Sequence, residues 1–304
     1  MKILDTLNIE SSEPTAVAVG FFDGVHRGHQ AVINAALAHK AEGLKTCVFS
    51  FSMSGSSPAA KKGAKLLQTP TLKAQTIADM GADWLLLPDF SAFMGFSPEQ
   101  FAIEGLLKGM NAKIVCCGYD YRFGKGACAG AEDLKRFLSP YGVKIEQVGA
   151  VLDNGEPISS TRIRAALSEG KAEEAARLLG RPFAIDFPVE RGMQLGRKLG
   201  FPTANQRIEP AFAALRFGVY ATRVTIDGKS YPAVTNVGVK PTVGSDFIGA
   251  ESFILDWSGD IYGKNLKTEF LSFLRPEQKF ASLEELQQAV FKNADEAREI
   301  FSTK

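Results

Sequence analysis

The sequence predicts an α/β domain with a doubly wound parallel sheet, followed by a small antiparallel β-barrel with a terminal helix. Three observations support this fold class. The chain has 304 residues, which is longer than a single hydrophobic core usually grows. From residue 15 to about 150, short apolar runs alternate with helical patterns, as in parallel sheets covered by helices on both faces. After residue 183, β-branched and aromatic runs alternate with turn signals, as in antiparallel barrels.

The elements of the first half follow in order along the chain. Strands are expected at TAVAVG, LKTCVFSF, WLLLP and KIVCCG, with helices near residues 28–42, 71–80 and 98–110. Two more helical patterns follow, RIRAALSEG and KAEEAARLLG, and the second ends at Gly180 with Pro182 beyond it. We therefore predict an N-terminal domain at 1–182 and a C-terminal domain at 183–304.

The second half has a different texture. Strands are expected at GVYATRVTI, SYPAVTNVGV, ESFILDW and KTEFLSFL. A helix is expected from Ser282 to about Phe301, because a Ser-Leu-Glu-Glu capping pattern precedes apolar residues at helical spacing. The segment 52–65 is rich in small and polar residues, which favours a mobile surface loop.

Composition and charge narrow the classes of function. The formal net charge is +1, so no strong field attracts nucleic acid or an acidic membrane surface, and neither partner is expected. The cysteines, Cys47, Cys116, Cys117 and Cys128, have neither zinc-site spacing nor the density of a disulfide scaffold. No apolar run approaches the roughly 20 residues that span a bilayer. We expect a cytoplasmic protein with reduced thiols that acts on small molecules.

The run GFFDGVHRGHQ, residues 20–30, follows the first expected strand and leads into a helical pattern. Its glycines allow tight turns, and the helix start presents free N–H groups and a positive dipole end. His26 and His29 can donate hydrogen bonds from one side of that helix. The pattern favours a phosphate site over two ordinary histidines, because two of the three histidines in the chain fall in one turn. A zinc site is disfavoured because no further ligand lies nearby.

The segment ISSTRIR, residues 158–164, places hydroxyl groups at a helix start and two arginines in its first turn. By itself, Ser-Ser-Thr is a capping pattern. Arg162 and Arg164 oppose the positive end of the helix dipole unless an anion shares the site. The segment therefore favours a further phosphate contact.

With its HxGH core, GFFDGVHRGHQ followed by ISSTRIR resembles the nucleotidyltransferase superfamily, and specifically the FAD synthetase module of bacterial riboflavin kinase/FMN adenylyltransferases. The resemblance implies a Rossmann-like domain that binds ATP. It marks His26, His29 and Arg164 as candidate catalytic residues. The implied ATP-binding residues of this half are Gly20, Phe21, Asp23, Gly24, His26, His29, Ser160, Thr161 and Arg164.

A third segment, GYDYRFGKG at 118–126, follows KIVCCG and looks like the family's G-x-D-F-x-F-G stretch. Asp120, Arg122 and Phe123 are its candidate flavin-binding residues. The chain departs from the family after the second strand, where FSFSMSG stands in place of the usual TF-x-PHP stretch. This departure bears on flavin binding and on the rate of adenylylation.

The run GRKLGFPTAN, residues 196–205, lacks the order of a Walker loop. Gly196 and Lys198 belong to a predicted cationic loop over phosphates. Thr203 and Asn205 supply oxygens of the kind that Mg²⁺ prefers. From this segment alone, a basic hairpin loop with a Pro turn is the alternative.

The same run resembles the PTAN signature of riboflavin kinases, a family of six-stranded barrels. GVY, NVGVKPT, ESFILDW, IYG and LRPEQKF follow it in the family's order. The resemblance implies that Gly196, Lys198, Thr203 and Asn205 bind ATP, and that Thr203 and Asn205 hold its magnesium ion.

Glu251 is the implied base for the ribityl hydroxyl, since a carboxylate beside Mg-ATP can accept a proton from an attacking alcohol. A barrel-rim acid paired with a lysine is the alternative for this residue, and Glu269 is the competing carboxylate. Arg275 is the candidate contact on the flavin or phosphate side.

The resemblance covers roughly residues 15–302 and implies a bifunctional enzyme. Riboflavin and ATP would give FMN and ADP in the C-terminal domain. FMN and a second ATP would give FAD and pyrophosphate in the N-terminal domain. Mg²⁺ is expected with ATP as co-substrate, and no permanently bound cofactor is required. The alternatives are a riboflavin kinase with a decayed adenylyltransferase domain, a flavin-binding regulator without turnover, and an adenylyltransferase with a different acceptor.

Overall fold

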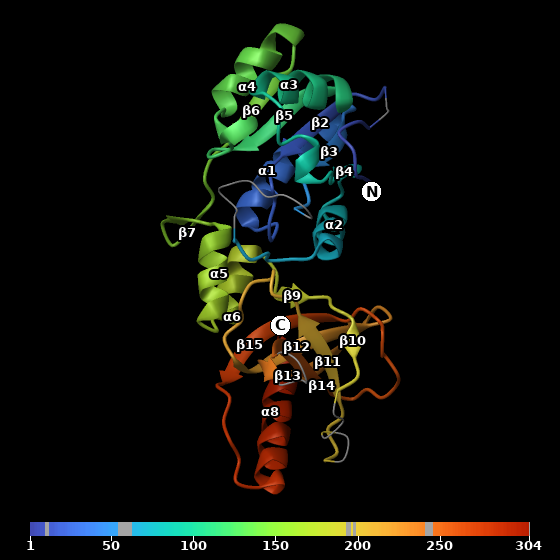
Figure 1. Cartoon of the computed structure of the whole chain (residues 1–304), viewed down its shortest axis with the longest axis vertical. Coiled ribbons are helices and arrows are strands. Elements are labelled where there is room, and N and C mark those ends of the chain that lie inside the picture. The colour runs from blue at the N-terminus through green and yellow to red at the C-terminus, as the bar shows by residue number, and fades with distance from the viewer. Residues whose placement is uncertain (10–11, 54–62, 193–195, 197–198, 241–245, 304) are drawn as a thin grey trace. The chain divides into compact units, whose positions relative to one another are not determined.

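The computed structural model describes the whole chain except residues 10–11, 54–62, 193–195, 197–198, 241–245 and 304 (Figure 1). The chain divides into two compact units. The first contains Met1–Ala64 and Pro70–Ser159, and the second contains Lys65–Thr69 and Ser160–Lys304. Most of the predicted loop at 52–65 lies outside the described residues.

The first unit is built on a sheet of six parallel strands, in the order β1-β4-β3-β2-β5-β6. The four expected strands are all present, and β1 and β6 extend the sheet at its two edges. The bounds are β1 (Lys2–Leu4), β2 (Thr15–Val19), β3 (Lys45–Phe49), β4 (Trp84–Leu86), β5 (Ala112–Gly118) and β6 (Lys144–Val148).

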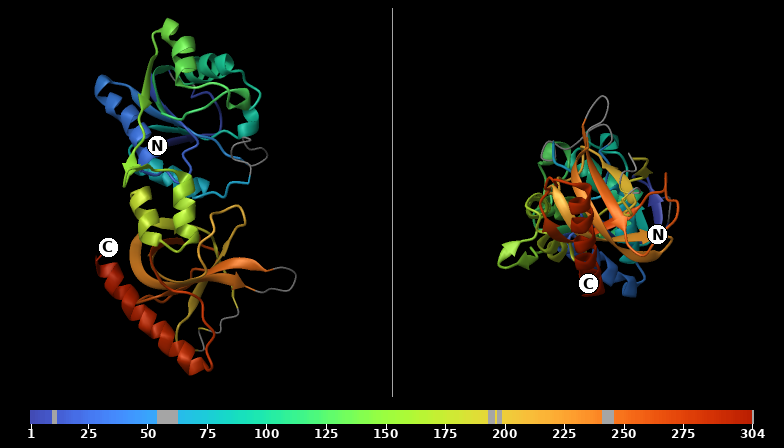
Figure 2. Two further views of the ribbon diagram at one scale, coloured as in Figure 1. Left: turned by 90° about the vertical axis from the view of Figure 1, so that its left-hand side faces the viewer. Right: turned by 90° about the horizontal axis from the view of Figure 1, so that it is seen from below.

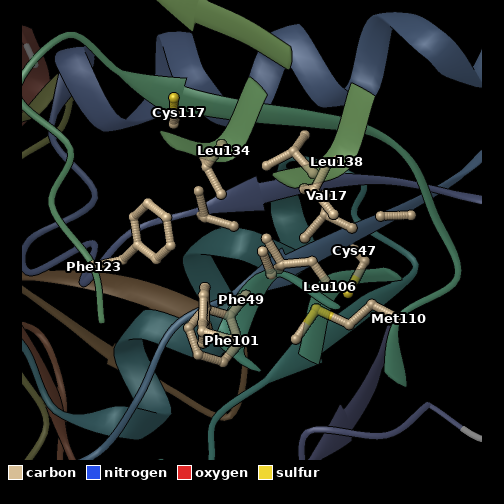
Figure 3. Packing of buried hydrophobic residues seen from close by; sticks show 14 of the residues in the cluster. Val17, Cys47, Phe49, Phe101, Leu106, Met110, Cys117, Phe123, Leu134 and Leu138 are labelled. Atoms are coloured by element: carbon tan, nitrogen blue, oxygen red, sulfur yellow. The ribbon is translucent and has the colours of Figure 1, made fainter. Parts of the chain in front are cut away.

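Helices cover both faces of this sheet, which confirms the predicted doubly wound fold (Figure 1). Ala16 and Ala18 of β2 pack in the cluster formed with α1 (Arg27–Ala38) and α2 (Pro70–Asp79). The alternate residues Val17 and Val19 pack in the opposite cluster (Figure 3). That cluster is formed with the π-helix η4 (Phe101–Gly109) and with α4 (Ala131–Leu138). The strands are therefore buried on both sides, as their continuous apolar runs indicate.

The short elements of the first unit adjust the predicted boundaries. The helix expected at 28–42 is α1 followed by a 3-10 turn, and the helix expected at 98–110 is a short α-turn followed by η4. A small hairpin precedes the end of the unit. The remaining bounds are η1 (His39–Glu42), η3 (Phe90–Ala92), α3 (Pro98–Gln100), η5 (Lys125–Ala127), η6 (Ser139–Tyr141), β7 (Leu152–Asp153) and β8 (Glu156–Pro157).

The direction of chain winding reverses beside β2. From β2 the chain moves to β3 and β4 on one side, and then crosses to β5 on the other side. In open parallel sheets, ligands bind beyond the carboxyl ends of the strands at such a switch point. β2 ends directly before the run 20–30, and β5 ends at Gly118, the first residue of the run 118–126. Because Val19 and Cys117 are register partners, these two runs leave the sheet side by side.

In the described residues, the second unit contains the helices α5, α6 and α8 and an antiparallel sheet of seven strands, in the order β10-β11-β14-β13-β12-β15-β9. The predicted barrel fold is confirmed, with seven strands where the resemblance implied six. Both short end strands, β9 and β10, and the strand β11 add to the four expected from sequence. The bounds are α5 (Ser160–Ser168), α6 (Ala172–Leu179), β9 (Phe183–Ile185), β10 (Val189–Glu190), β11 (Thr203–Ile208), β12 (Gly218–Ile226), β13 (Lys229–Lys240), β14 (Phe247–Ile254) and β15 (Lys267–Arg275).

The terminal helix α8 (Leu283–Thr303) packs on the outside of the barrel sheet (Figure 2). Its residues Ala294 and Ala297 are buried against Val219 of β12 and Val234 of β13. The Ser282 hydroxyl accepts a hydrogen bond from the Glu285 N–H at 3.2 Å, as the capping pattern predicts.

Three further observations apply to the residues that the structure describes. The four cysteines are free thiols, three of them buried and Cys128 exposed. No group of three or more histidine, cysteine, aspartate or glutamate side chains is placed to hold a metal ion in this part of the chain. Across the same residues, no helix is long and apolar enough to cross a membrane.

Candidate active sites

The run 20–30, which leads from β2 into α1 and which we call the phosphate turn after its predicted role, has an unusual backbone. Phe22 (φ 51°), Gly24 (φ 86°) and Val25 (φ 40°) all adopt left-handed conformations. Such angles are costly for residues with a Cβ, most of all for a β-branched one, and persist where the surroundings hold them. Phe22 and Val25 are fully buried, and the Gly20 N–H donates to the Phe49 carbonyl at 3.1 Å. The turn is therefore a rigid feature of the sheet edge.

His26 and His29 lie together at the start of α1, as predicted. His26 is the N-cap residue, and its Nδ1 accepts from the His29 N–H at 3.3 Å. This nitrogen therefore carries no proton, and the neutral ring is protonated at Nε2. The two rings stack with centroids 3.5 Å apart. His26 is 5% exposed, whereas His29 is half-buried.

One buried charged residue lies within this turn and another lies beside it, and the second was not predicted from the sequence. Asp23, a predicted ATP-site residue, is 2% exposed. Lys73 of α2 is 6% exposed, and its Nζ donates to the Phe21 carbonyl at 2.9 Å and to Ser50 Oγ at 3.2 Å. Ser50 Oγ also donates to the Phe21 carbonyl, at 2.7 Å. Lys73 stands in an ordinary helical pattern, so the sequence contains no signal that marks its burial.

The second phosphate motif begins in the first unit. A Cβ placed on Gly28 would lie 3.7 Å from the carbonyl oxygen of Ile158, the first residue of ISSTRIR. Ser160, Thr161 and Arg164 follow on α5, which belongs to the second unit. Within that unit, Arg164 Nε donates to the Lys65 carbonyl at 2.5 Å. Ser160 and Arg164 are half-buried and Thr161 is exposed.

The three candidate flavin residues in the segment after β5 differ in exposure. Asp120 and Arg122 are exposed, whereas Phe123 is 6% exposed. The Phe123 ring packs in the core near Phe101, with centroids 5.7 Å apart (Figure 3). Arg122 lines a surface cleft with Tyr119, Tyr121, Gly130, Ala131, Glu132, Asp133 and Gln147.

Aromatic rings surround Phe51, which lies in the FSFSMSG stretch that stands in place of TF-x-PHP. Phe51 lies 4.8 Å from Phe21 and 5.4 Å from Phe90, measured between ring centroids. The Ser52 hydroxyl lies 3.3 Å from an Asp89 carboxylate oxygen. The altered segment is thus joined to the phosphate turn through the Phe21 ring.

In the second unit, the predicted magnesium ligands stand on a regular strand. Thr203 and Asn205 are two residues apart on β11, so their side chains share one face of the sheet. Glu251 of β14 is the direct register partner of Asn205, and Asn236 of β13 is the partner of Glu251. We call Asn205, Glu251 and Asn236 the polar row. The row brings the predicted base next to a predicted metal ligand, and it adds Asn236, which the sequence analysis did not single out.

The two competing carboxylates of the barrel differ in their surroundings. The Glu251 side chain is 35% exposed and lies 3.0 Å from Lys240 Nζ. The Glu269 side chain is 10% exposed and is held by Arg223 at 2.7 Å and by Lys267 at 3.0 Å. Glu269 therefore has two cations that fix it, as a structural acid would. Glu251 is paired with one lysine, as the barrel-rim alternative requires, and it also stands in the row of polar side chains, as the predicted base requires.

Two glycines after β10 make close approaches, and that of Gly192 is to the polar row. A Cβ on Gly192 would lie 2.7 Å from Asn205 Nδ2, and one on Gly196 would lie 2.5 Å from the Phe201 carbonyl oxygen. Gly196 is described and half-buried, whereas Lys198 lies outside the described residues.

Arg275, the last residue of β15, points to the terminal helix. Its Nε donates to Asn293 Oδ1 of α8 at 2.9 Å, and its guanidinium lies 5.5 Å from the centre of the Phe280 ring. Burial lowers the pKa of Arg275 below its ordinary value, and the Glu296 carboxylate partly opposes this effect. Arg275 is the register partner of Val219, and Val219 is in turn the partner of Asn236, so Arg275 is in line with the polar row.

Comparison with known proteins covers both units. The model of the FAD synthetase family matches residues 8–162, and the model of the riboflavin kinase family matches residues 179–301. A protein of Pseudomonas fluorescens named bifunctional riboflavin kinase/FMN adenylyltransferase is 36% identical, over 92% of this chain and 90% of its own length. The chain belongs to the bifunctional riboflavin kinase/FMN adenylyltransferase family.

Other members of the bifunctional riboflavin kinase/FMN adenylyltransferase family match to a similar extent. The Escherichia coli protein of that name is 32% identical over 98% of this chain and 96% of its own length. The Listeria monocytogenes protein is 33% identical, with 94% and 92% covered. Among solved structures, one from Streptococcus pneumoniae described as a macrolide-efflux protein aligns with a TM-score of 0.85 and 31% identity, over 97% of this chain and 98% of that one. The recognition made from the two motifs is therefore confirmed.

Proposed function

We propose that this chain makes flavin cofactors in two steps, phosphorylating riboflavin to FMN and then adenylylating FMN to FAD. The single observation that carries the proposal is that both family models match, FAD synthetase over residues 8–162 and riboflavin kinase over residues 179–301. The geometry supports it. The phosphate turn lies at the switch point of the parallel sheet, and the polar row lies on the barrel.

In the first step, the riboflavin 5′-hydroxyl attacks the γ-phosphorus of ATP, the bond to ADP breaks, and FMN forms. Glu251 accepts the hydroxyl proton. Thr203 and Asn205 supply hydroxyl and amide oxygens on the face that Glu251 shares, which suits a magnesium ion brought in with ATP. Lys240, 3.0 Å from Glu251, adds a positive charge beside the transferring group. Positioning and charge stabilisation account for most of the acceleration in such transfers.

In the second step, a phosphate oxygen of FMN attacks the α-phosphorus of another ATP, and pyrophosphate leaves. The protein provides no nucleophile. His26 donates from Nε2, and with His29 and the first N–H groups of α1 it stabilises the charge on the reacting phosphate. Ser160, Thr161 and Arg164 stay predicted ATP contacts, and Asp120, Arg122, Phe123 and Arg275 stay predicted flavin contacts.

The proposal extends to the reaction conditions. ATP enters with Mg²⁺ as a co-substrate, and we expect that no permanently bound cofactor is required. The four free thiols suit a reducing compartment, so we place the enzyme in the cytoplasm. We also keep the functional boundary between domains at 182/183.

The experiment that tests the proposal is a timed incubation of the purified chain with riboflavin, ATP and Mg²⁺, with the three flavins separated by chromatography. FMN that rises first and then gives way to FAD is the expected result. FMN without FAD would identify a kinase with a decayed adenylyltransferase unit. The absence of both products would favour a flavin-binding regulator.

A further inference from the structure

Lys73 is a charged side chain buried in the first unit, outside every motif of the sequence. An ammonium group loses favourable hydration when it is buried, and lysine is among the residues least often found inside proteins. A leucine or methionine would fill the same place on α2 without that cost. The contacts of Lys73 must therefore supply something that an apolar side chain cannot.

These contacts join three elements at one point. The ammonium binds the Phe21 carbonyl at 2.9 Å, and Phe21 directly precedes the left-handed residue Phe22. It also contacts the hydroxyl of Ser50, the residue that follows β3, at 3.2 Å. The same ammonium lies 4.6 Å from the centre of the Phe21 ring. One charge on α2 thus holds the carboxyl ends of two adjacent strands at the entry of the turn.

We propose that Lys73 is a positioning residue for adenylyl transfer, which holds the Gly20–Gln30 turn in the shape that receives the ATP phosphates. The inference rests on the proposed function of the first unit and adds a residue to it. Strained backbone persists where the surrounding contacts hold it in place. Lys73 provides such a contact through its hydrogen bond to the Phe21 carbonyl. No role in proton transfer is required of Lys73.

Because Lys73 acts through its charge, we expect a characteristic pH dependence of FAD formation. Burial lowers the pKa of Lys73 to about 8, and the buried Asp23 carboxylate, the charged group that acts on it from the turn, partly opposes this effect. The ammonium is therefore charged at neutral pH and loses its proton just above it. FAD formation from FMN should fall as pH rises through about 8. Arginine stays charged over this range, so Lys73→Arg should keep FAD formation at higher pH.

The test compares Lys73→Met with Lys113→Met, a change at an exposed lysine of β5 in the same unit. Both full-length variants are assayed for FMN adenylylation and for riboflavin phosphorylation, which serves as an internal control. We expect Lys73→Met to lower kcat/KM for adenylylation about 10²-fold, since misplacement of a reacting group by about 1 Å can cost that much. Phosphorylation should be unchanged. Lys73→Arg should recover part of the loss and lack the alkaline fall.

Amide hydrogen exchange of residues 20–30 gives a readout that does not depend on turnover. Loss of protection is expected in Lys73→Met and not in Lys113→Met. If both exchange and adenylylation in Lys73→Met match those of Lys113→Met, the inference is overturned. A wild-type chain that forms no FAD would reject the proposed function alone, and the exchange result would still decide on Lys73.

Ser50→Ala provides a second variant in case Lys73→Met does not fold. It removes the hydroxyl that both Lys73 and the Phe21 carbonyl contact, and keeps the buried charge. A smaller loss of adenylylation than in Lys73→Met, with faster exchange of the turn, is expected. Wild-type rates and wild-type protection in Ser50→Ala would count against the positioning role of Lys73.

Discussion

The phosphate turn of the first unit and the polar row of the second hold their functional groups in opposite ways. In the turn, the groups are neighbours in sequence, and their geometry depends on left-handed backbone at Phe22 and Val25. In the polar row, Asn205, Glu251 and Asn236 are far apart in sequence, and regular strand pairing aligns them. The difference suggests that the turn is sensitive to the residues around it, whereas the row is sensitive to the identity of its own side chains.

The largest expected effect is that of Glu251→Gln, which tests the row at one side chain. The amide keeps the shape and loses the ability to accept a proton, so FMN formation should fall about 10²- to 10⁴-fold. The fold should be retained, because the Glu251 side chain is 35% exposed. Flavin separation after incubation with riboflavin and ATP measures the loss. Adenylylation of added FMN by the same variant should be unchanged.

The matched control is Glu269→Gln on β15. It breaks the contacts with Arg223 and Lys267 and should cost stability, while the chemical step is retained. If Glu269→Gln loses FMN formation and Glu251→Gln does not, the assignment of the base is wrong.

His29→Ala is the corresponding change in the turn. It removes a side chain placed to donate to a charged phosphate, so FAD formation from added FMN should fall about 10²- to 10³-fold. Riboflavin phosphorylation should continue. His39→Ala changes the third histidine of the chain, which pairs with Glu42 and Glu146 away from the turn, and should keep FAD formation. FAD made at the wild-type rate by His29→Ala would remove the assignment of the turn.

A smaller effect is expected for Gly192→Ala, which disturbs the row from outside. The added Cβ would lie 2.7 Å from Asn205 Nδ2, so the amide must move. A displaced magnesium ligand should lower FMN formation about ten- to a hundredfold. Higher Mg²⁺ should recover part of this loss, which kinetics over a magnesium series would measure. If Gly192→Ala is as active as the wild type, FMN formation does not depend on the exact position of the Asn205 amide. The polar row would then not depend on its own side chains in the way that the comparison with the turn requires.

The smallest effect concerns stability far from both sites. Burial disfavours the charged form of His39, but the hydrogen bonds and charges of Glu146 and Glu42 outweigh it, and the pKa of His39 is raised. A raised folded-state pKa stabilises the fold fully below the unfolded value of about 6.5, and this contribution is lost as pH rises through the folded value. Because Glu42 is 63% exposed, solvent screening limits the contribution to below about 1 kcal/mol.

The measurement compares the wild type with His39→Gln in urea unfolding at increasing pH. The stability difference should shrink as pH rises. Trp84 and Trp257 are the two tryptophans of the chain, one in each unit, so Trp257→Phe leaves Trp84 to report on the first unit. A difference that grows with pH would contradict the assigned sign.

The sequence predicts most of the fold because its periodic segments are strong. The buried strands of the first unit are continuous apolar runs, and those of the barrel are rich in β-branched residues. The short strands β1, β9 and β10 were not predicted, because two or three residues carry no period. The strand β11 was also not predicted, because the run 196–205 was interpreted through its cationic loop and its magnesium ligands. Pairing with β14 places Thr203 and Asn205 on a regular strand that begins directly after Pro202.

The site residues also divide into those that a sequence pattern marks and those that only the folded structure identifies. Motif residues such as His26 and Glu251 were singled out because their types and order are visible in the sequence, and their roles stay predictions. Lys73 could not be predicted, because only the folded chain shows that it is buried beside the turn. Asn236 opens the NVGVKPT run, but only the strand pairing shows that it lies opposite Glu251. The family models end at 162 and resume at 179, so the boundary at 182/183 stays a prediction.

With Glu251 as the proposed base, the pairing of β14 with its neighbours would make the kinase chemistry an all-or-none property of strand alignment. Along a strand, successive side chains point to opposite faces, so a slip of one residue would put Ala250 or Ser252 where Glu251 now stands. A single inserted or deleted residue in this strand would therefore turn the base into the barrel interior, while the composition of the protein hardly changed. Such an insertion or deletion would leave a folded chain that does not phosphorylate riboflavin.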